Sequence, residues 1–285
     1  MVLSRSGYQR LAAVVLIVLL GLAAAGRGMG DIPLESHEIY VAQTAENMLE
    51  SGDWLVPRLN GEYRLTKPPL SYWLVAGAGA MTGQAQVSPA LARAPSVLAL
   101  VGIALLAAWI GARLFEPRTG LLAGLMCVAS FSAFKYGHNA RPDMLYAFWT
   151  IAVLAVWLAL REVSPRQARY GAWAMWLLFA LATLTKGPQA PAIMLGGAVV
   201  YDGLFGAGWR LVWRRLHAVV GAAIVAVIVL PWYLWLRAAI GATTLDDSQV
   251  SGALLSVDIT RLFAPFYFLR TPLLWLPWAL LLPVA

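Results

Sequence analysis

The chain has 285 residues, of which 60% are hydrophobic and 12% are charged, against about 45–50% and about 25% in a typical soluble domain. With a single cysteine as well, this composition excludes a soluble globular enzyme, a disordered chain and a disulfide-stapled secreted domain, and it indicates a polytopic membrane protein. The net charge of +7 comes from 21 basic and 14 acidic residues. Arginines that flank membrane spans explain this excess better than a nucleic-acid partner does.

Eight runs without a charged residue are candidates for membrane-spanning helices, which need about 20 residues, or fewer where flanking Lys or Arg side chains snorkel. They lie at 11–26, 95–112, 119–134, 144–160, 170–185, 187–201, 216–236 and from 271 to the end. The first run also fits a cleaved signal peptide, because Arg5 and Arg10 precede it and Ala23-Ala24-Ala25 resembles a cleavage site. In either case the loop that follows is delivered to the outer side.

One further charge-free stretch, 68–92, is a poorer candidate for a span. Its apolar part runs from Leu70 to Met81, about 12 residues, a length that favours an interfacial or re-entrant helix. If this stretch does not cross, the arginine-bearing loops at 113–118, 161–169 and 210–215 all lie on the side of the N-terminus. The positive-inside rule places that side in the cytoplasm. Every lysine of the chain then lies at or near the outer face: Lys67, Lys135 and Lys186.

We therefore expect an all-α polytopic membrane protein in three parts. These are a first transmembrane helix at 1–29, a periplasmic loop with juxtamembrane helices at 30–92, and a transmembrane bundle of about seven helices at 93–285. The chain stops at Ala285 inside an apolar run. The sequence therefore predicts a fragment of a longer membrane protein, with a bundle that is incomplete at the C-terminus.

Within the outer loop, the segment from Ser36 to near Gly52 predicts an amphipathic helix with Ser36 as its N-cap. Val41, Ala45 and Met48 fall on one apolar face at helical spacing. Glu38 falls in the first turn, where a carboxylate either complements the helix dipole or belongs to a functional site.

Later in the same loop, three basic residues, Arg58, Arg64 and Lys67, lie within ten residues of one another and next to Tyr72 and Trp73. One interpretation is a basic patch that touches anionic head groups beside an aromatic belt. The other is a site for a phosphate-bearing lipid, to which arginine offers bidentate geometry and lysine a point charge.

Two more outer segments carry ionisable residues next to apolar runs. Arg141-Pro142-Asp143 begins the run at 144–160, and an acid at such a place is costly near lipid unless it is paired or faces a cavity. Lys186 precedes Gly187-Pro188, where a helix breaks, and snorkelling alone also explains it. A common cavity at the outer face would let the acids Glu35, Glu38 and Asp143 meet the bases Arg58, Arg64, Lys67, Arg141 and Lys186.

The order of these motifs resembles a known family. The chain is similar to the bacterial polyprenyl-phosphate-sugar glycosyltransferases in four motifs that occur in this order: M-L-E-S-G-D-W-L-V-P-R-L-N-G, T-K-P-P-L-S-Y-W-L, A-R-P-D-M and L-T-K-G-P. These are the aminoarabinose-transferase and protein-mannosyltransferase relatives with the membrane-embedded GT-C fold. The likeness runs from about Glu35 to Pro188, with later support from Pro231-Trp232-Tyr233 and Pro277-Trp278. Family members are considerably longer, so only their N-terminal part is present.

The resemblance implies transfer of a sugar from a polyprenyl-phosphate donor to lipid A, another envelope glycan or a protein, with inversion, on the periplasmic face of the bacterial inner membrane. It places an acid of the first loop and the acid of the second loop, Asp143, at the reaction centre. By the resemblance the first acid maps to Glu38. Many members have Asp-Glu where this chain has His37-Glu38, so Glu35 and His37 stay alternative candidates for this role. The expected contacts to substrate are Arg58, Arg64, Lys67, Tyr72, Arg141, Lys186 and His37.

No cofactor is expected. The sequence shows no nucleotide-binding loop, which fits a lipid-linked donor, and no metal motif, since the three histidines, His37, His138 and His217, are scattered along it. A divalent metal held by other residues is not identifiable from the sequence. The implied partners are the lipid-linked donor, a lipid or protein acceptor and the bilayer. The main rival is a transporter or flippase for a lipid-linked substrate, which predicts internal repeats and acids or prolines at mid-span depth. Pro191, Asp202 and Pro231 interrupt apolar runs, but the charges concentrate at one face.

Overall fold

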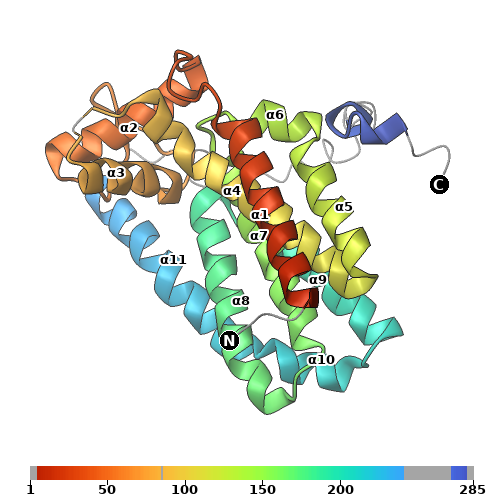
Figure 1. Ribbon diagram of the computed structural model, residues 1–285. Coiled ribbons are helices and arrows are strands. Elements are labelled where there is room, and N and C mark those ends of the chain that lie inside the picture. The colour runs from red at the N-terminus through yellow and green to blue at the C-terminus, as the bar shows by residue number, and fades with distance from the viewer. Residues whose placement is uncertain (1–4, 85, 241–270, 281–285) are drawn as a thin grey trace. The chain divides into compact units, whose positions relative to one another are not determined.

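The computed structural model describes residues 5–84, 86–240 and 271–280, and in these residues the chain is almost wholly helical. The labelled elements of the described residues run in the order α1 (Arg5–Gly26), α2 (Ser36–Ser51), β1 (Arg58–Leu59), β2 (Glu62–Tyr63), α3 (Leu70–Thr82), α4 (Pro89–Leu114), α5 (Pro117–Val128), α6 (Phe131–Gly137), α7 (Pro142–Leu160), α8 (Pro165–Lys186), α9 (Gln189–Phe205), α10 (Trp209–Leu216) and α11 (Ala218–Ile240) (Figure 1). The expected all-α class is confirmed.

The chain divides into two compact units that do not follow chain order. The first contains 1–39, 88–144 and 258–285, and the second contains 40–87 and 145–257. The first residues of α2 and of α7 therefore belong to the first unit, and the remainder of each helix belongs to the second.

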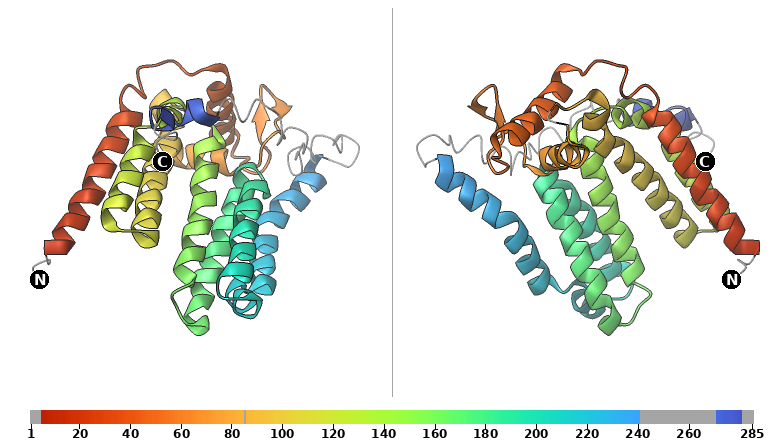
Figure 2. Two further views of the ribbon diagram at one scale, coloured as in Figure 1. Left: turned by 90° about the vertical axis from the view of Figure 1, so that its right-hand side faces the viewer. Right: turned by 60° about the vertical axis from the view of Figure 1, so that its left-hand side comes forward.

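In the first unit, α1, α5 and α6 all pack on the long helix α4 (Figure 2). Helix α4 begins where Ser88 accepts a hydrogen bond from the Leu91 N–H, with Pro89 in the first turn, a position that proline tolerates. Small residues let α4 and α5 approach closely, as is common between membrane helices. A methyl group at Gly120 of α5, for example, would lie 2.6 Å from the Cβ of Ala112.

In the second unit, α11, α10 and α3 all pack on α8 (Figures 1 and 2). A core cluster of this unit joins α7, α8, α9 and α10 and includes the fully buried Trp157 and Met175. The hairpin turns at Asn60-Gly61, where both residues have positive φ, +52° and +82°, the conformation that favours Asn-Gly in two-residue turns. Trp232 of α11 donates to the carbonyl oxygen of Leu55 at 2.9 Å and so ties the loop before the hairpin to the helices.

Four helical segments in the described residues are long and apolar enough to cross a membrane: Gly7–Gly26, Pro89–Leu114, Pro142–Leu160 and Trp209–Ala239. A fifth span is formed if α5 and α6, which meet at a bend of 52°, are taken together. Two other predicted spans also form helices, but neither is both long enough and apolar enough to cross a membrane. Helix α8 is long but less apolar, and α9 is apolar but has only 17 residues. The predicted last span, from 271, extends beyond the described residues.

Three predictions for individual segments have clear outcomes. Helix α3 has 13 residues and ends at Gly83 in the left-handed conformation, so 68–92 does not form a helix of spanning length, as expected. The loop expected at 210–215 is instead part of α10, and α8 already begins at Pro165, inside the loop expected at 161–169. Charge-free runs underestimate helices because arginine side chains can lie on a helix and still reach water.

Candidate active site

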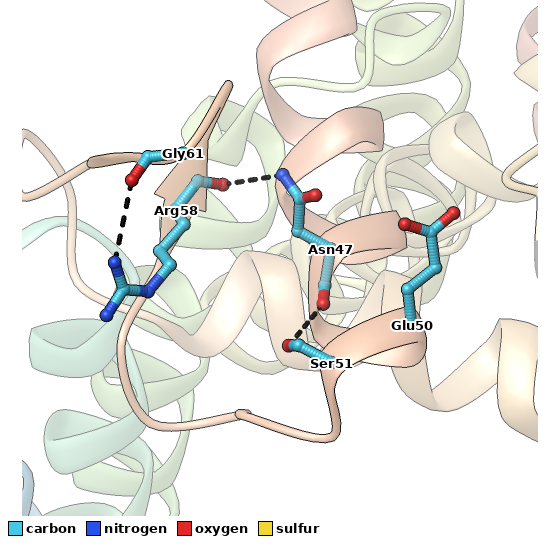
Figure 3. Close-up of a pocket in the computed structure, with 5 residues that line it drawn as sticks. All are labelled: Asn47, Glu50, Ser51, Arg58 and Gly61. Carbon is cyan, nitrogen blue, oxygen red and sulfur yellow. Dashed lines mark hydrogen bonds between the residues drawn. The ribbon is translucent and has the colours of Figure 1, made fainter.

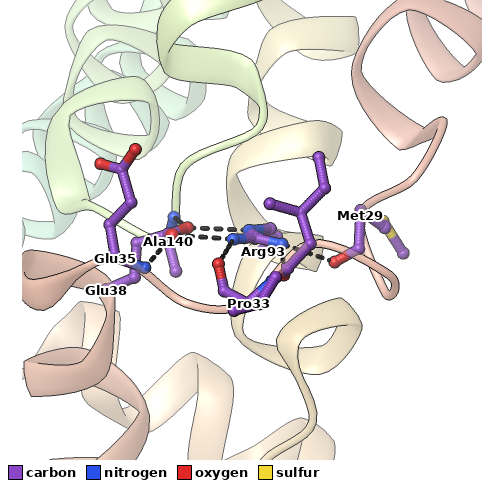
Figure 4. A network of polar contacts seen from close by, with 7 residues as sticks. Met29, Pro33, Glu35, Glu38, Arg93 and Ala140 are labelled. Carbon is purple, nitrogen blue, oxygen red and sulfur yellow. Dashed lines mark hydrogen bonds and ion pairs between the residues drawn. The ribbon is translucent and has the colours of Figure 1, made fainter.

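The carboxylate of Glu38 lies at the centre of a polar network in the first unit (Figure 4). Glu38 belongs to the first turn of α2, and its side chain is only 2% exposed. The carbonyl oxygen of Glu35 accepts the first helical hydrogen bond, from the Ile39 N–H, while the Glu35 N–H donates to Glu38 Oε2 at 2.9 Å. The N-cap is therefore Glu35 and not Ser36, because Glu38, three residues on, satisfies the backbone of Glu35 as in a capping box.

Arg93 of α4 is the partner of Glu38, and it is also buried, with 3% of its surface exposed. Its Nε donates to Glu38 Oε1 at 2.8 Å, and its Nη2 donates to Oε2 at 2.7 Å, the bidentate geometry that suits a carboxylate. The same guanidinium donates to three backbone carbonyl oxygens of the loop after α1, those of Met29, Ile32 and Pro33, at 2.7–3.1 Å. One side chain thus fixes the outer loop and the start of α2.

The network reaches the second predicted acidic segment through the backbone. The Ala140 N–H donates to Glu38 Oε1 at 2.8 Å, a contact between residues 102 positions apart in the sequence. Ser96 of α4 donates to the carbonyl oxygen of Arg141 at 3.2 Å. Arg141 Nε lies 3.2 Å from Asp143 Oδ2, and this ion pair is much more accessible, with the side chains 41% and 27% exposed. Five predicted site residues therefore belong to this one unit: Glu35, His37, Glu38, Arg141 and Asp143.

The contacts of Glu38 determine its protonation. Burial alone would raise the pKa of its carboxyl group, but the hydrogen bonds from Arg93, Glu35 and Ala140, together with the charge of Arg93, lower the pKa below its usual value. The carboxylate is ionised at neutral pH and already accepts two hydrogen bonds on each oxygen. A carboxylate in this state is a weak proton acceptor and holds structure. Glu35 and His37, in contrast, are exposed on the same turn.

The remaining predicted residues belong to the second unit: Arg58 in β1, Arg64 after β2, Lys67 before α3, Tyr72 in α3 and Lys186 at the end of α8. The guanidinium of Arg64 lies 4.4 Å from the centre of the Tyr40 ring. Burial raises the pKa of the Tyr72 hydroxyl. The charge of Arg64 and a hydrogen bond with Arg64 act in the opposite direction but do not outweigh burial. These contacts hold Arg64 in place. The predicted meeting of acids and bases in one cavity stays a prediction.

Arg58 lines a shallow pocket of about 270 Å³ together with Asn47, Glu50, Ser51 and Gly61 (Figure 3). Asn47 donates to the carbonyl oxygen of Arg58 at 3.1 Å, which fixes the hairpin against α2. The guanidinium of Arg58 lies 4.6 Å from the centre of the Tyr63 ring. Among the residues that the structure describes, no group of three or more His, Cys, Asp or Glu side chains is arranged to hold a metal ion.

Arg93 is the residue that the sequence interpretation missed. It precedes the apolar run at 95–112 by two residues and lies inside α4. A charged residue so close to a long apolar segment is costly unless it is paired, and this is the signal that would have pointed to it. No local sequence pattern identifies Glu38, 55 residues earlier, as the partner of Arg93.

Comparison with protein families places residues 66–235 in the family described as dolichyl-phosphate-mannose-protein mannosyltransferase. An undecaprenyl phosphate-alpha-4-amino-4-deoxy-L-arabinose arabinosyl transferase of Pseudomonas aeruginosa (strain UCBPP-PA14) is 32% identical over 223 residues, which cover 73% of this chain and 38% of that protein. A protein of Aquifex aeolicus is 27% identical over 262 residues, which cover 90% of this chain and 49% of that protein.

Among solved structures, ArnT from Cupriavidus metallidurans bound to undecaprenyl phosphate matches with a TM-score of 0.79 at 24% identity, over 99% of this chain and 51% of that one. The apo oligosaccharyltransferase of Archaeoglobus fulgidus matches with a TM-score of 0.59 at 19% identity, over 98% of this chain and 36% of that one. These likenesses confirm the expected GT-C-type fold. The chain spans about half the length of these proteins, or less.

We predict that loss of the buried pair destabilises the protein far more than loss of the accessible one. Glu38→Gln or Arg93→Gln leaves a buried charge unpaired, which costs about 3–5 kcal/mol. Arg141→Gln is the matched control, because it breaks a more exposed pair of the same chemistry in the same unit, worth at most about 1 kcal/mol. Thermal unfolding in detergent measures both. Equal losses for the two pairs would contradict the structural role of Glu38.

The lowered pKa of Glu38 gives this prediction a pH dependence. Its contribution to stability is fully present above the unfolded-state pKa of about 4.3 and is lost as the pH falls towards the lower, folded-state pKa. The wild type should therefore lose stability below about pH 4.3, and Glu38→Gln should lose less over the same range.

Proposed function

The chain belongs to the family of dolichyl-phosphate-mannose-protein mannosyltransferases, membrane glycosyltransferases that use polyprenyl-phosphate sugars, and from this premise we propose that it forms the membrane-embedded part of such an enzyme. The donor in this proposal is a sugar on a polyprenyl phosphate, and the acceptor is lipid A, another envelope glycan or a protein. The observation that carries it is the match to the family over 66–235, within a chain similar to arabinosyl transferases named for undecaprenyl phosphate.

The proposed orientation places the N-terminus in the cytoplasm and the site in the periplasm. Exposed arginines support it at the connections between α4 and α5 and between α9 and α11, among them Arg113, Arg118, Arg210 and Arg214. The arrangement in three parts, with a first helix at 1–29, an outer loop at 30–92 and a bundle from 93, follows from the same orientation.

In the proposed reaction, a hydroxyl oxygen of the acceptor attacks the anomeric carbon of the donor sugar. The bond from that carbon to the phosphate oxygen breaks with inversion, the hydroxyl proton passes to a carboxylate, and the phosphate leaves as an anion. A positioned carboxylate accelerates such a step by accepting the proton. Cations stabilise the charge that develops on the phosphate. Because the leaving group is a phosphate anion, no acid is required to protonate it.

We assign the proton-accepting role to Asp143, with Glu35 as the first-loop carboxylate. Both are more accessible than Glu38, and the Asp143 carboxylate lies beside Arg141 at the start of α7. Glu38 is assigned a positioning role, because its oxygens are occupied by Arg93 and two backbone N–H groups. His37, exposed on the same turn as Glu35, is kept as a contact to the sugar.

The leaving phosphate is assigned to basic residues of the second unit: Arg58, Arg64, Lys67 and Lys186. The guanidinium of Arg64 lies over the Tyr40 ring and makes a hydrogen bond with the Tyr72 hydroxyl, which supports a fixed cation at this place. Tyr72, buried beside it and protonated at neutral pH, supports that geometry. Lys67 supplies a compact charge immediately before Pro68-Pro69.

We predict that Asp143→Asn lowers sugar transfer at least a hundredfold, the smallest contribution usual for a general base, while membrane insertion is unchanged. The assay uses the full-length protein in vesicles with labelled polyprenyl-phosphate sugars and total envelope acceptors. Glu62→Gln is the matched control, because Glu62 is an exposed acid of the outer hairpin with no assigned role, and it should transfer normally.

Near-normal turnover in Asp143→Asn would remove this residue from the reaction. Donor-dependent transfer by the wild type identifies the acceptor pool from the position of the label. If the folded wild type transferred no sugar from any donor, the transferase proposal would fail and a transporter for the lipid-linked substrate would replace it.

The proposed orientation predicts opposite labelling at two exposed acids. In a Cys127→Ser background, an impermeant maleimide should label Glu62→Cys in intact spheroplasts. It should label Glu162→Cys, in the connection between α7 and α8, only after the membrane is opened. The reverse pattern would invert the topology and place the hairpin in the cytoplasm.

A further inference from the structure

Helix α10 is short, strongly amphipathic and rich in arginine. Three of its eight residues are Arg. Val212 and Leu216 are buried in the core cluster of the second unit. The other face exposes Trp209 and Trp213, which are 41% and 58% accessible. Arg210 and Arg214 are exposed too. The two arginines are four residues apart, as are the two tryptophans, so the members of each pair lie on the same side of the helix.

This face is held rigidly by contacts from the buried side. Arg215 donates to the carbonyl oxygen of Arg161 at 2.8 Å, and Trp176 of α8 donates to that of Leu216 at 2.8 Å. Arg161 in turn lies 3.1 Å from Oδ1 of the buried Asp202, which also accepts a hydrogen bond from Trp157 at 2.9 Å. The exposed arginines and tryptophans are therefore presented in a fixed arrangement.

The position of α10 follows from the spans beside it. Its core cluster includes Leu160, the last residue of the candidate span α7, so α10 lies at that end of the second unit (Figure 1). His217, in the left-handed conformation with φ +46°, separates it from α11. The candidate span Trp209–Ala239 includes both helices, but α11 alone has 23 residues, enough to cross the hydrocarbon core. A bilayer that is crossed by α11 leaves α10 in the head-group layer.

We propose that the exposed face of α10 is a binding surface for the head groups of anionic phospholipids. The guanidinium groups of Arg210 and Arg214 match phosphate in charge and geometry. Trp209 and Trp213 have the amphipathic rings that prefer the depth of the head groups. An acidic protein partner would use the same charges, but tryptophans beside two membrane spans favour lipid. The proposal concerns the membrane surface and does not depend on sugar transfer.

The test measures lipid preference with the full-length protein in neutral detergent–phosphatidylcholine micelles. Head-group binding is followed by titration with fluorescent phosphatidylglycerol and, separately, with fluorescent phosphatidylcholine. The wild type should prefer phosphatidylglycerol, and added salt should weaken this preference. Arg210→Gln/Arg214→Gln should lower the affinity for phosphatidylglycerol roughly twenty-five-fold, about fivefold for each arginine, with unchanged thermal unfolding.

Arg113→Gln/Arg118→Gln is the matched control, because it removes the same charge from two exposed arginines at the connection between α4 and α5. It should keep the preference. The proposal is overturned if both double variants lose the preference equally, if neither loses it, or if the wild type has none. The proposal would also be overturned if soluble glycerol phosphate competed with fluorescent phosphatidylglycerol as well as unlabelled phosphatidylglycerol does, because α10 would then be a site for free anions. If the α10 double variant is misfolded, Arg214→Gln alone decides, with about a fivefold loss expected.

Discussion

The buried ion pair between Glu38 and Arg93 is the constraint on which the outer part of the first unit depends. Two charges this deeply buried are tolerated only when each is paired and hydrogen-bonded, and here every contact that satisfies them is a structural tie. Arg93 binds the backbone after α1 at three carbonyl oxygens, and Glu38 binds the backbone of Glu35 and Ala140. Three segments that are distant in the sequence thus share one polar centre. Removal of Arg93 takes the partner of the loop after α1, and removal of Glu38 takes the partner of the Glu35 and Ala140 N–H groups. The start of α2 and the approach to Asp143 are positioned by this centre.

This arrangement separates the residue that organises the site from the residues proposed to react. In the sequence, Glu38 is a candidate for a catalytic carboxylate through the family resemblance, while its place in the first turn of a loop helix is also explained by the helix dipole. Its surroundings argue for a different role, because a carboxylate with a lowered pKa and occupied oxygens accepts a proton poorly. The more accessible Glu35 and Asp143 flank the same centre. The proposed function would explain why such a centre is worth its desolvation cost, because sugar transfer requires that acceptor and donor groups are held at fixed positions.

Much of this could be predicted from sequence, and the failures have physical reasons. The helix from 36 to 51, the Asn60-Gly61 turn, the short helix α3 and the position of Asp143 in the first turn of α7 all follow from local rules of spacing, turn chemistry and length. The pairing of Arg93 could not be predicted, because no sequence pattern near Arg93 identifies Glu38, 55 residues earlier, as its ion-pair partner. The arginines at 210–215 predict a loop between two membrane spans if charged residues are taken to lie outside helices. In the structure they belong to helix α10, which buries Val212 and Leu216 on its other side. The N-cap was displaced by one residue because the side chain of Glu38 reaches back to Glu35.

Hydrogen exchange at the backbone of Glu35 and Ala140 tests the central claim most directly, since both N–H groups donate to the Glu38 carboxylate. In the wild type both amides should exchange slowly, and in Arg93→Gln both should exchange faster together, because the carboxylate that accepts them is no longer held in place. The Leu91 N–H, which donates to Ser88 at the start of α4, is the internal reference and should keep its rate. Unchanged protection of Ala140 after the loss of Arg93 would contradict the account, because the approach to Asp143 would then be positioned without the buried pair.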